Sequence, residues 1–204
     1  LAGLMRWRAF VRDTAAEFGY TQTRWHTFKR LDTIAARHER IAVGGDSAGG
    51  NLAAVVALQA RDAHGPAIAF QLLIYPATDQ RGQHPSVTRN GEGYLLTKKA
   101  MDYFQSLYLP KKEQLTDWRA SPLLAKSLAG LPPAFLITAG YDPLLDEGRA
   151  YAERMAREGV EVAYREYPDM VHGFILFGGV LDTANAAVAD CCAALLERWT
   201  TEEP

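Results

Sequence analysis

The chain has 204 residues, a formal net charge of −2, 48% hydrophobic residues and only two cysteines. This composition is typical of a globular protein, and we expect a single domain over residues 1–204. The near-neutral charge and the lack of basic runs argue against a nucleic acid or an anionic membrane surface as a partner, and we expect no stable membrane insertion. The adjacent Cys191 and Cys192 indicate neither a disulfide framework nor a metal site, so we expect buried, reduced thiols. No signal-peptide pattern is present, which favours a cytoplasmic location.

Residues 1–39 predict helices and no strand. Apolar residues recur at helical spacing from Leu4 to Phe18 and again from Trp25 to Ala35. We therefore expect a helical N-terminal segment over residues 1–39, which leads directly into the first strand.

Residues 40–61 predict a strand, a sharp turn and a helix. The turn has the pattern Gly-x-Ser-x-Gly around Ser47. In such an elbow the serine takes a strained backbone conformation, and Gly45 and Gly49 allow backbone to approach where a Cβ would clash. The hydroxyl would stand at a helix N-terminus, where the Ala48 amide and the helix dipole favour an oxyanion. The alternative is a glycine-rich turn between strand and helix with no catalytic role.

Further apolar runs predict strands at residues 69–75, 134–139 and 160–167, in addition to the strand at 40–45. Strands that alternate with helices indicate an α/β fold with a parallel sheet and helices on both faces. The last run alternates in polarity, which suits a sheet edge. Residues 79–133 predict a loop and helical connection. Within it, Thr97 opens a helix whose apolar face would carry Met101, Phe104 and Tyr108.

Three residues with complementary chemistry each follow a predicted strand: Ser47, Asp142 and His172. A serine hydroxyl is a poor nucleophile at neutral pH, so it needs an imidazole to take its proton and a carboxylate to orient that imidazole. The carboxyl ends of parallel strands share one edge of a sheet, where ligands bind in α/β folds. We expect Ser47 as nucleophile, His172 as general acid and base, and Asp142 as the orienting acid. This chemistry requires no metal and no cofactor.

Each assignment has an alternative. Asp142 could instead cap the next helix, with Asp146 as the competing acid, although Asp146 is also available as that cap. Asp142 is favoured because it lies nearer the strand end. The remaining histidines, which lie on the early helices or in turns, are His26, His38, His64 and His84. Asp46 is expected to orient the elbow, or else to be an exposed turn residue, and Glu147 to stabilise the first turn of its helix.

The stretch Gly44-Gly45-Asp46-Ser47-Ala48-Gly49-Gly50-Asn51-Leu52-Ala53 resembles the serine motif of the hormone-sensitive-lipase-like esterases, the bacterial family IV branch of the α/β-hydrolases. The run Asp142-Pro143-Leu144-Leu145-Asp146-Glu147-Gly148 is similar to the acid motif of that family, and His172-Gly173-Phe174 to its histidine motif. The resemblance covers residues 40–199. It implies an α/β-hydrolase fold, the three roles given above, and hydrolysis of small carboxylic esters, usually with short acyl chains, through an acyl-enzyme and without a cofactor.

Members of that family also carry a His-Gly-Gly-Gly loop and several strands upstream of the serine, and no such loop precedes Ser47 here. That loop supplies oxyanion donors, and losing one donor typically costs about 100- to 1000-fold in rate. Ala48 is then the one donor that can be named. Three explanations stay open: a truncated or incompletely represented esterase, a short form completed by a partner subunit, or a weakly active scaffold for small-molecule binding or assembly. The first two are favoured because all three triad residues are present.

The same departure leads us to expect a homodimer or a higher oligomer. Without further strands, the edge of the strand at 40–45 would lie open, and a long apolar edge invites pairing with another chain. The resemblance points the same way, since relatives often associate through their last strand.

Overall fold

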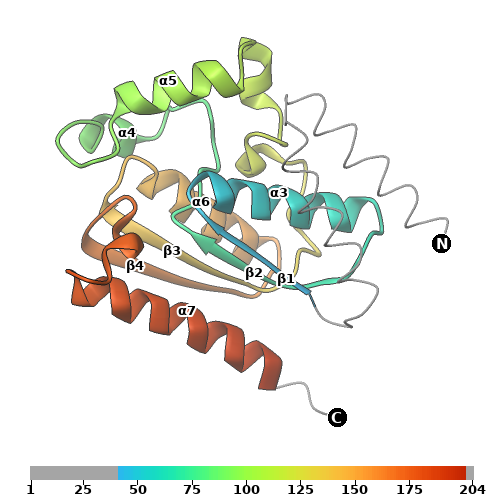
Figure 1. Cartoon of the computed structure of the whole chain (residues 1–204). Helices are drawn as coiled ribbons and strands as arrows, with labels where there is room; N and C mark the ends of the chain where they lie inside the picture. The colour runs from blue at the N-terminus through green and yellow to red at the C-terminus, as the bar shows by residue number, and fades with distance from the viewer. Residues whose placement is uncertain (1–40, 201–204) are drawn as a thin grey trace.

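The computed structural model describes residues 41–200, with side chains up to residue 198, so the helices predicted within residues 1–39 lie outside the described residues. Within that range, four parallel strands form one sheet in the order β1-β2-β3-β4 (Figure 1). The strands are β1 (Ile41–Asp46), β2 (Ile68–Ile74), β3 (Ala134–Tyr141) and β4 (Val162–Val171). All four strand predictions are confirmed. β4 lies at an edge as expected, and it runs on to Val171, past the predicted end at residue 167.

Helices cover both faces of the sheet, as predicted. Helices α3 (Ala48–Asp62) and α6 (Leu145–Arg157) lie on one face, and α7 (Asp182–Thr200) lies on the other (Figure 1). α6 ends at Arg157, and Gly159 just beyond its C-cap has a φ of 84°, the left-handed conformation that closes many helices. Because all three strand pairings are parallel, the carboxyl ends of the four strands lie at one edge of the sheet.

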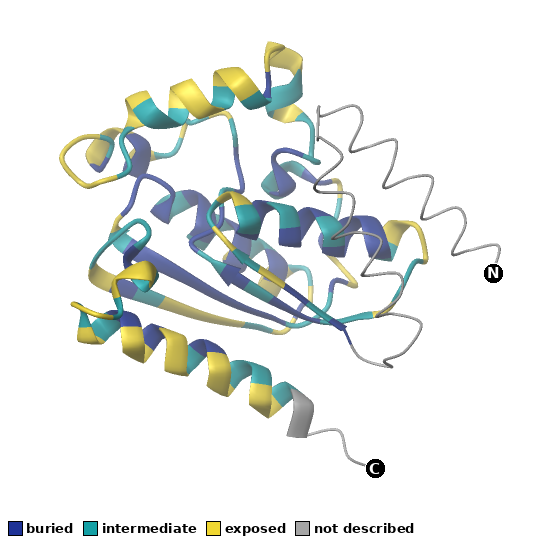
Figure 2. Cartoon of the chain, in the orientation of Figure 1, coloured by how far each residue is buried: buried dark blue, intermediate teal, exposed yellow. Residues whose placement is uncertain are grey.

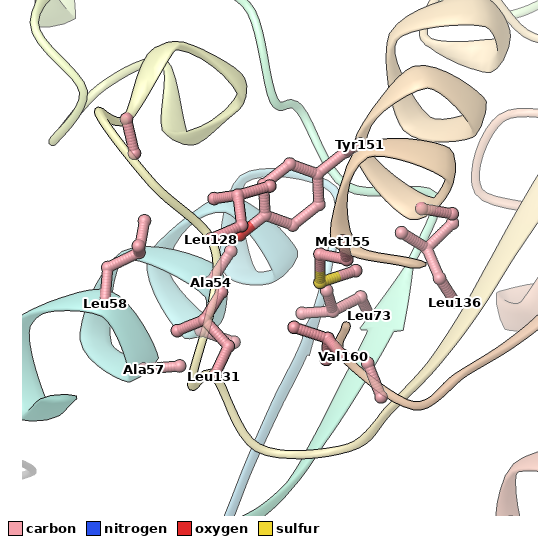
Figure 3. Packing of buried hydrophobic residues seen from close by; sticks show 14 of the residues in the cluster. Ala54, Ala57, Leu58, Leu73, Leu128, Leu131, Leu136, Tyr151, Met155 and Val160 are labelled. Carbon is pink, nitrogen blue, oxygen red and sulfur yellow. The ribbon is translucent and has the colours of Figure 1, made fainter. Parts of the chain in front are cut away.

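The larger core lies between the sheet, α3 and α6. Leu58 of α3, Leu73 of β2 and both Tyr151 and Met155 of α6 are fully buried there (Figure 3). Full burial of one such side chain stabilises the fold by about 1.5–3 kcal/mol. A second core of mainly β2, β3 and α7 side chains, including Phe174, fills the opposite face. The sheet is therefore held on both sides, which fixes the strand ends that carry the candidate site.

The connection between β2 and β3 contains α4 (Pro85–Arg89), α5 (Lys98–Tyr108) and the 3-10 turns η1 (Lys112–Thr116) and η2 (Pro122–Leu124). Thr97 caps α5 as predicted, because its hydroxyl accepts a hydrogen bond from the Ala100 amide at 3.1 Å. No residue of α5 is buried, and the side of α5 seen in Figure 2 is largely exposed. Phe104 is 59% exposed, so the predicted apolar face does not enter either core.

The two cysteines occupy different environments, and the prediction that both are buried is wrong for one of them. Both thiols are free, with Cys191 buried and Cys192 exposed. Adjacent residues on an α-helix point about 100° apart, so only one of them can face the sheet. Burial raises the pKa of the Cys191 thiol to about 11. Among residues 41–200, no helix combines the length and the apolar character that crossing a membrane requires.

Candidate active site

Ser47 stands in a sharp turn between β1 and α3. Its φ of 53° and ψ of −117° place a non-glycine residue in a conformation that L-residues rarely adopt. It occupies the N-cap position of α3, yet its hydroxyl makes no capping hydrogen bond. Its backbone is held instead: its amide donates to the Ile74 carbonyl at 2.9 Å, and its carbonyl accepts from the Asn51 amide at 3.0 Å. The hydroxyl is therefore free to point away from the helix.

The elbow depends on close backbone approach at Gly45. A Cβ on Gly45 would lie 2.4 Å from the carbonyl carbon of Gly49, a separation that real structures do not tolerate. The prediction that Gly49 meets the same constraint is wrong, because a Cβ there would meet only Asp46 Oδ1, at 3.8 Å. The second crowded position is Gly50, where a Cβ would lie 2.9 Å from Pro76 Cβ.

An irregularity in the pairing of β3 with β4 brings Asp142 and His172 side by side at the carboxyl ends of these strands. Ala139 pairs with Tyr167, but Tyr141 pairs with Val171, so β4 contains extra residues at this point. The bulge fits against Gly140, where a Cβ would lie 2.0 Å from the Pro168 carbonyl oxygen. Pro168 is tolerated because β4 is an edge strand and can do without one ladder donor.

Ser47, His172 and Asp142 form a continuous hydrogen-bonded chain. The Ser47 hydroxyl lies 2.8 Å from His172 Nε2, and His172 Nδ1 lies 2.6 Å from Asp142 Oδ2. Because a carboxylate only accepts hydrogen bonds, the imidazole proton is assigned to Nδ1, and Nε2 can accept the serine proton. The Asp142 side chain is fully buried and that of His172 is 12% exposed. The geometry has the order needed for proton transfer from hydroxyl to imidazole.

Asp142 contacts both His172 and the turn before α6, and the N-cap position of α6 is Leu144 rather than Asp142. While Oδ2 meets His172, Oδ1 accepts a hydrogen bond from the Leu144 amide at 2.8 Å, just before α6 begins. The expected capping role of Asp146 is wrong: this residue lies inside the first turn of α6, and its carboxylate accepts from the Ser86 amide at 2.8 Å. Asp146 therefore does not compete for the imidazole.

Tyr75 packs against His172, a contact that the sequence did not reveal. The centroids of the two rings lie 4.7 Å apart, and Phe174, which begins the 3-10 turn η3 (Phe174–Phe177), packs edge-on against Tyr75. Tyr75 has a φ of 35°, an unusual value at the end of a strand. Burial, followed by the negative charges of Asp46 and Asp142, raises the pKa of Tyr75 well above its ordinary value. Asp46 itself is exposed.

Glu147 lies in the first turn of α6, as predicted, but its side chain is buried. Its Oε1 accepts hydrogen bonds from the amides of Thr78 and Asp79 at 2.7 and 3.1 Å. Its Oε2 has no hydrogen-bond partner. Burial raises the pKa of Glu147 from 4.5 to about 8 despite these two bonds. Glu147 thereby fastens the loop after β2 to α6 as a neutral acid at pH 7.

Asp79, in the loop after β2, forms a separate buried ion pair. Arg81 Nε and Nη2 donate to its two oxygens at 2.9 and 2.6 Å, and His84 Nε2 lies 3.1 Å away. Burial favours the neutral acid, but these partners outweigh it and hold the pKa of Asp79 well below its usual range. Its charge is thus neutralised locally.

A cleft of about 530 Å³ opens beside Ser47 and runs beneath α5. Ala48 is exposed at the cleft, and as the first residue of α3 its amide has no acceptor within the helix. The apolar lining includes Leu52, Val87, Leu96, Met101, Phe104 and Leu144. Met101, Phe104 and Tyr108, the predicted apolar face of α5, therefore form part of the cleft wall. No group of three or more metal-ligating side chains occurs within residues 41–200.

The chain is similar to proteins of known fold. A family model described as alpha/beta hydrolase fold matches residues 11–176. Carboxylic ester hydrolase LipN of Mycobacterium tuberculosis is 44% identical over 79% of this chain and 44% of its own length. Ethyl acetate hydrolase of Pseudomonas putida is 34% identical over 89% of the chain and 57% of its own length. The chain thus spans about half the length of the curated relatives it matches.

Solved structures of ester hydrolases are similar to this chain as well. The thermophilic and thermostable carboxylesterase EstE1, cloned from a metagenomic library, superposes with a TM-score of 0.79 at 39% identity, over 83% of this chain and 60% of that one. An ester hydrolase from the metagenome of Lake Arreo superposes with a TM-score of 0.73 at 44% identity, over 94% of this chain and 56% of that one.

Proposed function

Because the chain belongs to the α/β-hydrolase superfamily, as a relative of the hormone-sensitive-lipase-like esterases, we propose that it carries the catalytic residues of a serine carboxylesterase. The observation that carries the proposal is the hydrogen-bonded chain from the Ser47 hydroxyl through His172 to the buried Asp142. A structural serine at an N-cap would use its hydroxyl to cap the helix, whereas here it faces an imidazole.

In the proposed acylation step, Ser47 Oγ attacks the ester carbonyl carbon while its proton passes to His172 Nε2. The Asp142 carboxylate stabilises the imidazolium that forms. The tetrahedral intermediate then breaks its bond to the alkoxide, which takes the proton from His172 and leaves as an alcohol. An acyl group stays bound to Ser47. Water attacks it with His172 again as base, and the carboxylic acid is released.

The oxyanion of each tetrahedral intermediate needs donors already in place. The amide of Ala48 and the N-terminal end of the α3 dipole supply one side of such a site. The backbone of Ser47, next to this amide, is fixed by hydrogen bonds of its own amide and carbonyl groups. Ala48 is therefore our proposed oxyanion donor from the described residues, with Gly45, Asp46 and Gly49 as the supporting elbow.

The cleft favours small, uncharged esters. Its lining is largely apolar close to Ser47, and the two cations that reach it are already paired: Arg81 with Asp79 and Lys98 with Asp102. An apolar wall with neutralised charges suits a short acyl chain better than an anionic substrate. We therefore propose short-chain carboxylic esters as the substrate class.

The test is hydrolysis of p-nitrophenyl acetate and butyrate by the protein and by Ser47→Ala. We expect the variant to lose nearly all turnover while keeping its circular dichroism spectrum and melting temperature. Ser127→Ala is the matched control, because this serine bonds to Glu158 near the end of α6, far from His172. Unchanged hydrolysis by Ser47→Ala would show that the assignment is wrong. Ester binding without any turnover by the parent protein would favour the alternative, a hydrolase-like scaffold.

A further inference from the structure

The short helix α4 is joined to the turn that carries Asp142 by a reciprocal set of hydrogen bonds. The Ser86 hydroxyl donates to the Pro143 carbonyl at 2.7 Å and accepts from the Asp146 amide at 3.1 Å. The Ser86 amide in turn donates to Asp146 Oδ2 at 2.8 Å. Ser86 is fully buried, so these bonds are shielded from water. Ser86 of α4 thus contacts both Pro143, just before α6, and Asp146, in the first turn of α6.

Asn90, at the other end of α4, reaches the same turn from the strand side. Its Nδ2 donates to the carbonyls of Gly140 and Asp142 at 3.0 and 3.1 Å, and only 3% of its surface is exposed. Its own amide donates to the Ser86 carbonyl at 2.8 Å, which ties the two residues into one unit. Without the Asn90 side chain, two carbonyl groups at the buried end of β3 would lose a donor, which costs free energy for each buried group left unpaired.

Together these bonds bracket Asp142. Gly140 lies before it in the strand irregularity, Pro143 lies after it in the turn, and Asp146 lies in the first turn of α6. The Asp142 carboxylate can meet His172 only while the backbone on both sides keeps this path, because the side chain has few rotatable bonds to correct a shift. Neither Ser86 nor Asn90 lines the cleft, and neither contacts Ser47 or His172 among the described hydrogen bonds.

We propose that Ser86 and Asn90 are positioning residues, which hold the turn of Asp142 so that its carboxylate stays on the imidazole of His172. This inference rests on the proposed esterase function and adds to it a support that lies in a different segment of the chain, between β2 and α5. It assigns a role to a loop that the sequence pattern shows only as a polar connection.

The experiment compares Asn90→Ala and Ser86→Ala with the parent protein in p-nitrophenyl butyrate hydrolysis, with rates normalised by active-site titration. We expect kcat to fall about 10- to 100-fold with KM nearly unchanged, well below the roughly 10⁴-fold loss seen when an orienting acid is itself replaced. Gln71→Ala is the matched control. That side-chain amide is also fully buried and donates to a backbone carbonyl, Pro132, at 2.9 Å, but it lies beside the start of β3, away from Asp142.

A second measurement does not depend on turnover. A short hydrogen bond from His172 Nδ1–H to the Asp142 carboxylate gives a far-downfield proton resonance, which we expect to shift or broaden in Asn90→Ala and Ser86→Ala but not in Gln71→Ala. Equal kcat losses in all three variants, or an unshifted resonance in the first two, would overturn the proposal. If Asn90→Ala does not fold, Ser86→Ala decides the outcome alone. A parent protein without Ser47-dependent turnover would refute the esterase function, while the resonance would still test the positioning role.

Discussion

Replacement of Glu147 by glutamine tests whether this buried carboxyl group is held in its neutral, protonated form. Its side chain is 1% exposed, one oxygen accepts two backbone amides, and the other has no hydrogen-bond partner. Burial raises its pKa from 4.5 to about 8, so the folded protein holds a neutral acid at pH 7. Glutamine keeps the shape and the accepting oxygen but cannot ionise. The two proteins should therefore differ in how their stability depends on pH.

Proton linkage gives the sign and the size of this dependence of stability on pH. Below about pH 4.5 the carboxyl is protonated in the folded and unfolded states alike, and it contributes no pH dependence. Between that pH and about 8 only the unfolded state ionises, so the free energy of unfolding falls as pH rises. Above the folded-state pKa both states are ionised and the loss is complete. Because the pKa is 4.5 in the unfolded state and about 8 in the folded state, the free energy of unfolding falls by up to about 5 kcal/mol, at about 1.36 kcal/mol per pH unit.

The assay is urea unfolding of the parent protein and Glu147→Gln at several values between about pH 5 and pH 9, where linkage predicts the difference to develop. The stability of the parent minus that of the variant should decrease steadily up to about pH 8 and then level off. Glu153→Gln, an exposed position on the same helix, is the control and should show a much smaller slope. A difference between the parent and Glu147→Gln that stays constant across this range would refute the reasoning.

Three further predictions test the site and the assembly. Asp142→Asn should lower kcat about 10⁴-fold in a p-nitrophenyl ester assay, because the imidazole loses its orienting carboxylate; a loss below tenfold would contradict the assignment. Gly45→Ala should destabilise the fold by at least about 1–3 kcal/mol in thermal unfolding, through its clash with Gly49, whereas Gly49→Ala should be neutral or stabilising; equal effects would contradict the elbow geometry. We also predict a homodimer, since β1 pairs only with β2 within residues 41–200, and a monomeric mass in sedimentation at micromolar concentration would count against it.

The four strands, and the position of each site residue after a strand end, could be predicted from the sequence because both depend on local patterns. A buried parallel strand needs a continuous apolar run, and the first three runs are of this kind, whereas the fourth alternates in polarity as an edge strand does. Parallel pairing then places all carboxyl ends at one edge. Ser47, Asp142 and His172 follow three different strands, so their proximity follows from topology without knowledge of any side-chain contact.

The contacts that complete the site depend on pairs distant in sequence, and these could not be predicted. The register of β4 changes at Pro168 because Gly140 leaves room for it, and neither residue alone indicates a bulge. The burial of Glu147 was missed because a carboxylate in the first turn of a helix usually faces water. Gly148, the next residue, packs closely on β3, where a Cβ would lie 2.9 Å from Thr138 Cγ2, but adjacent helical residues point about 100° apart, so this glycine does not indicate where Glu147 lies.

Three carboxyl groups are buried at this edge of the sheet, and the fold accommodates each in a different way. Asp79 is ionised and neutralised by the guanidinium of Arg81. Glu147 is kept neutral by burial up to about pH 8. Asp142 contacts His172 directly, and in the proposed mechanism it is the one of the three that stabilises the imidazolium. Because Asp79 and Asp142 both disfavour the ionised form of Glu147, its deprotonation above about pH 8 would add a second negative charge behind the site as it weakens the fold.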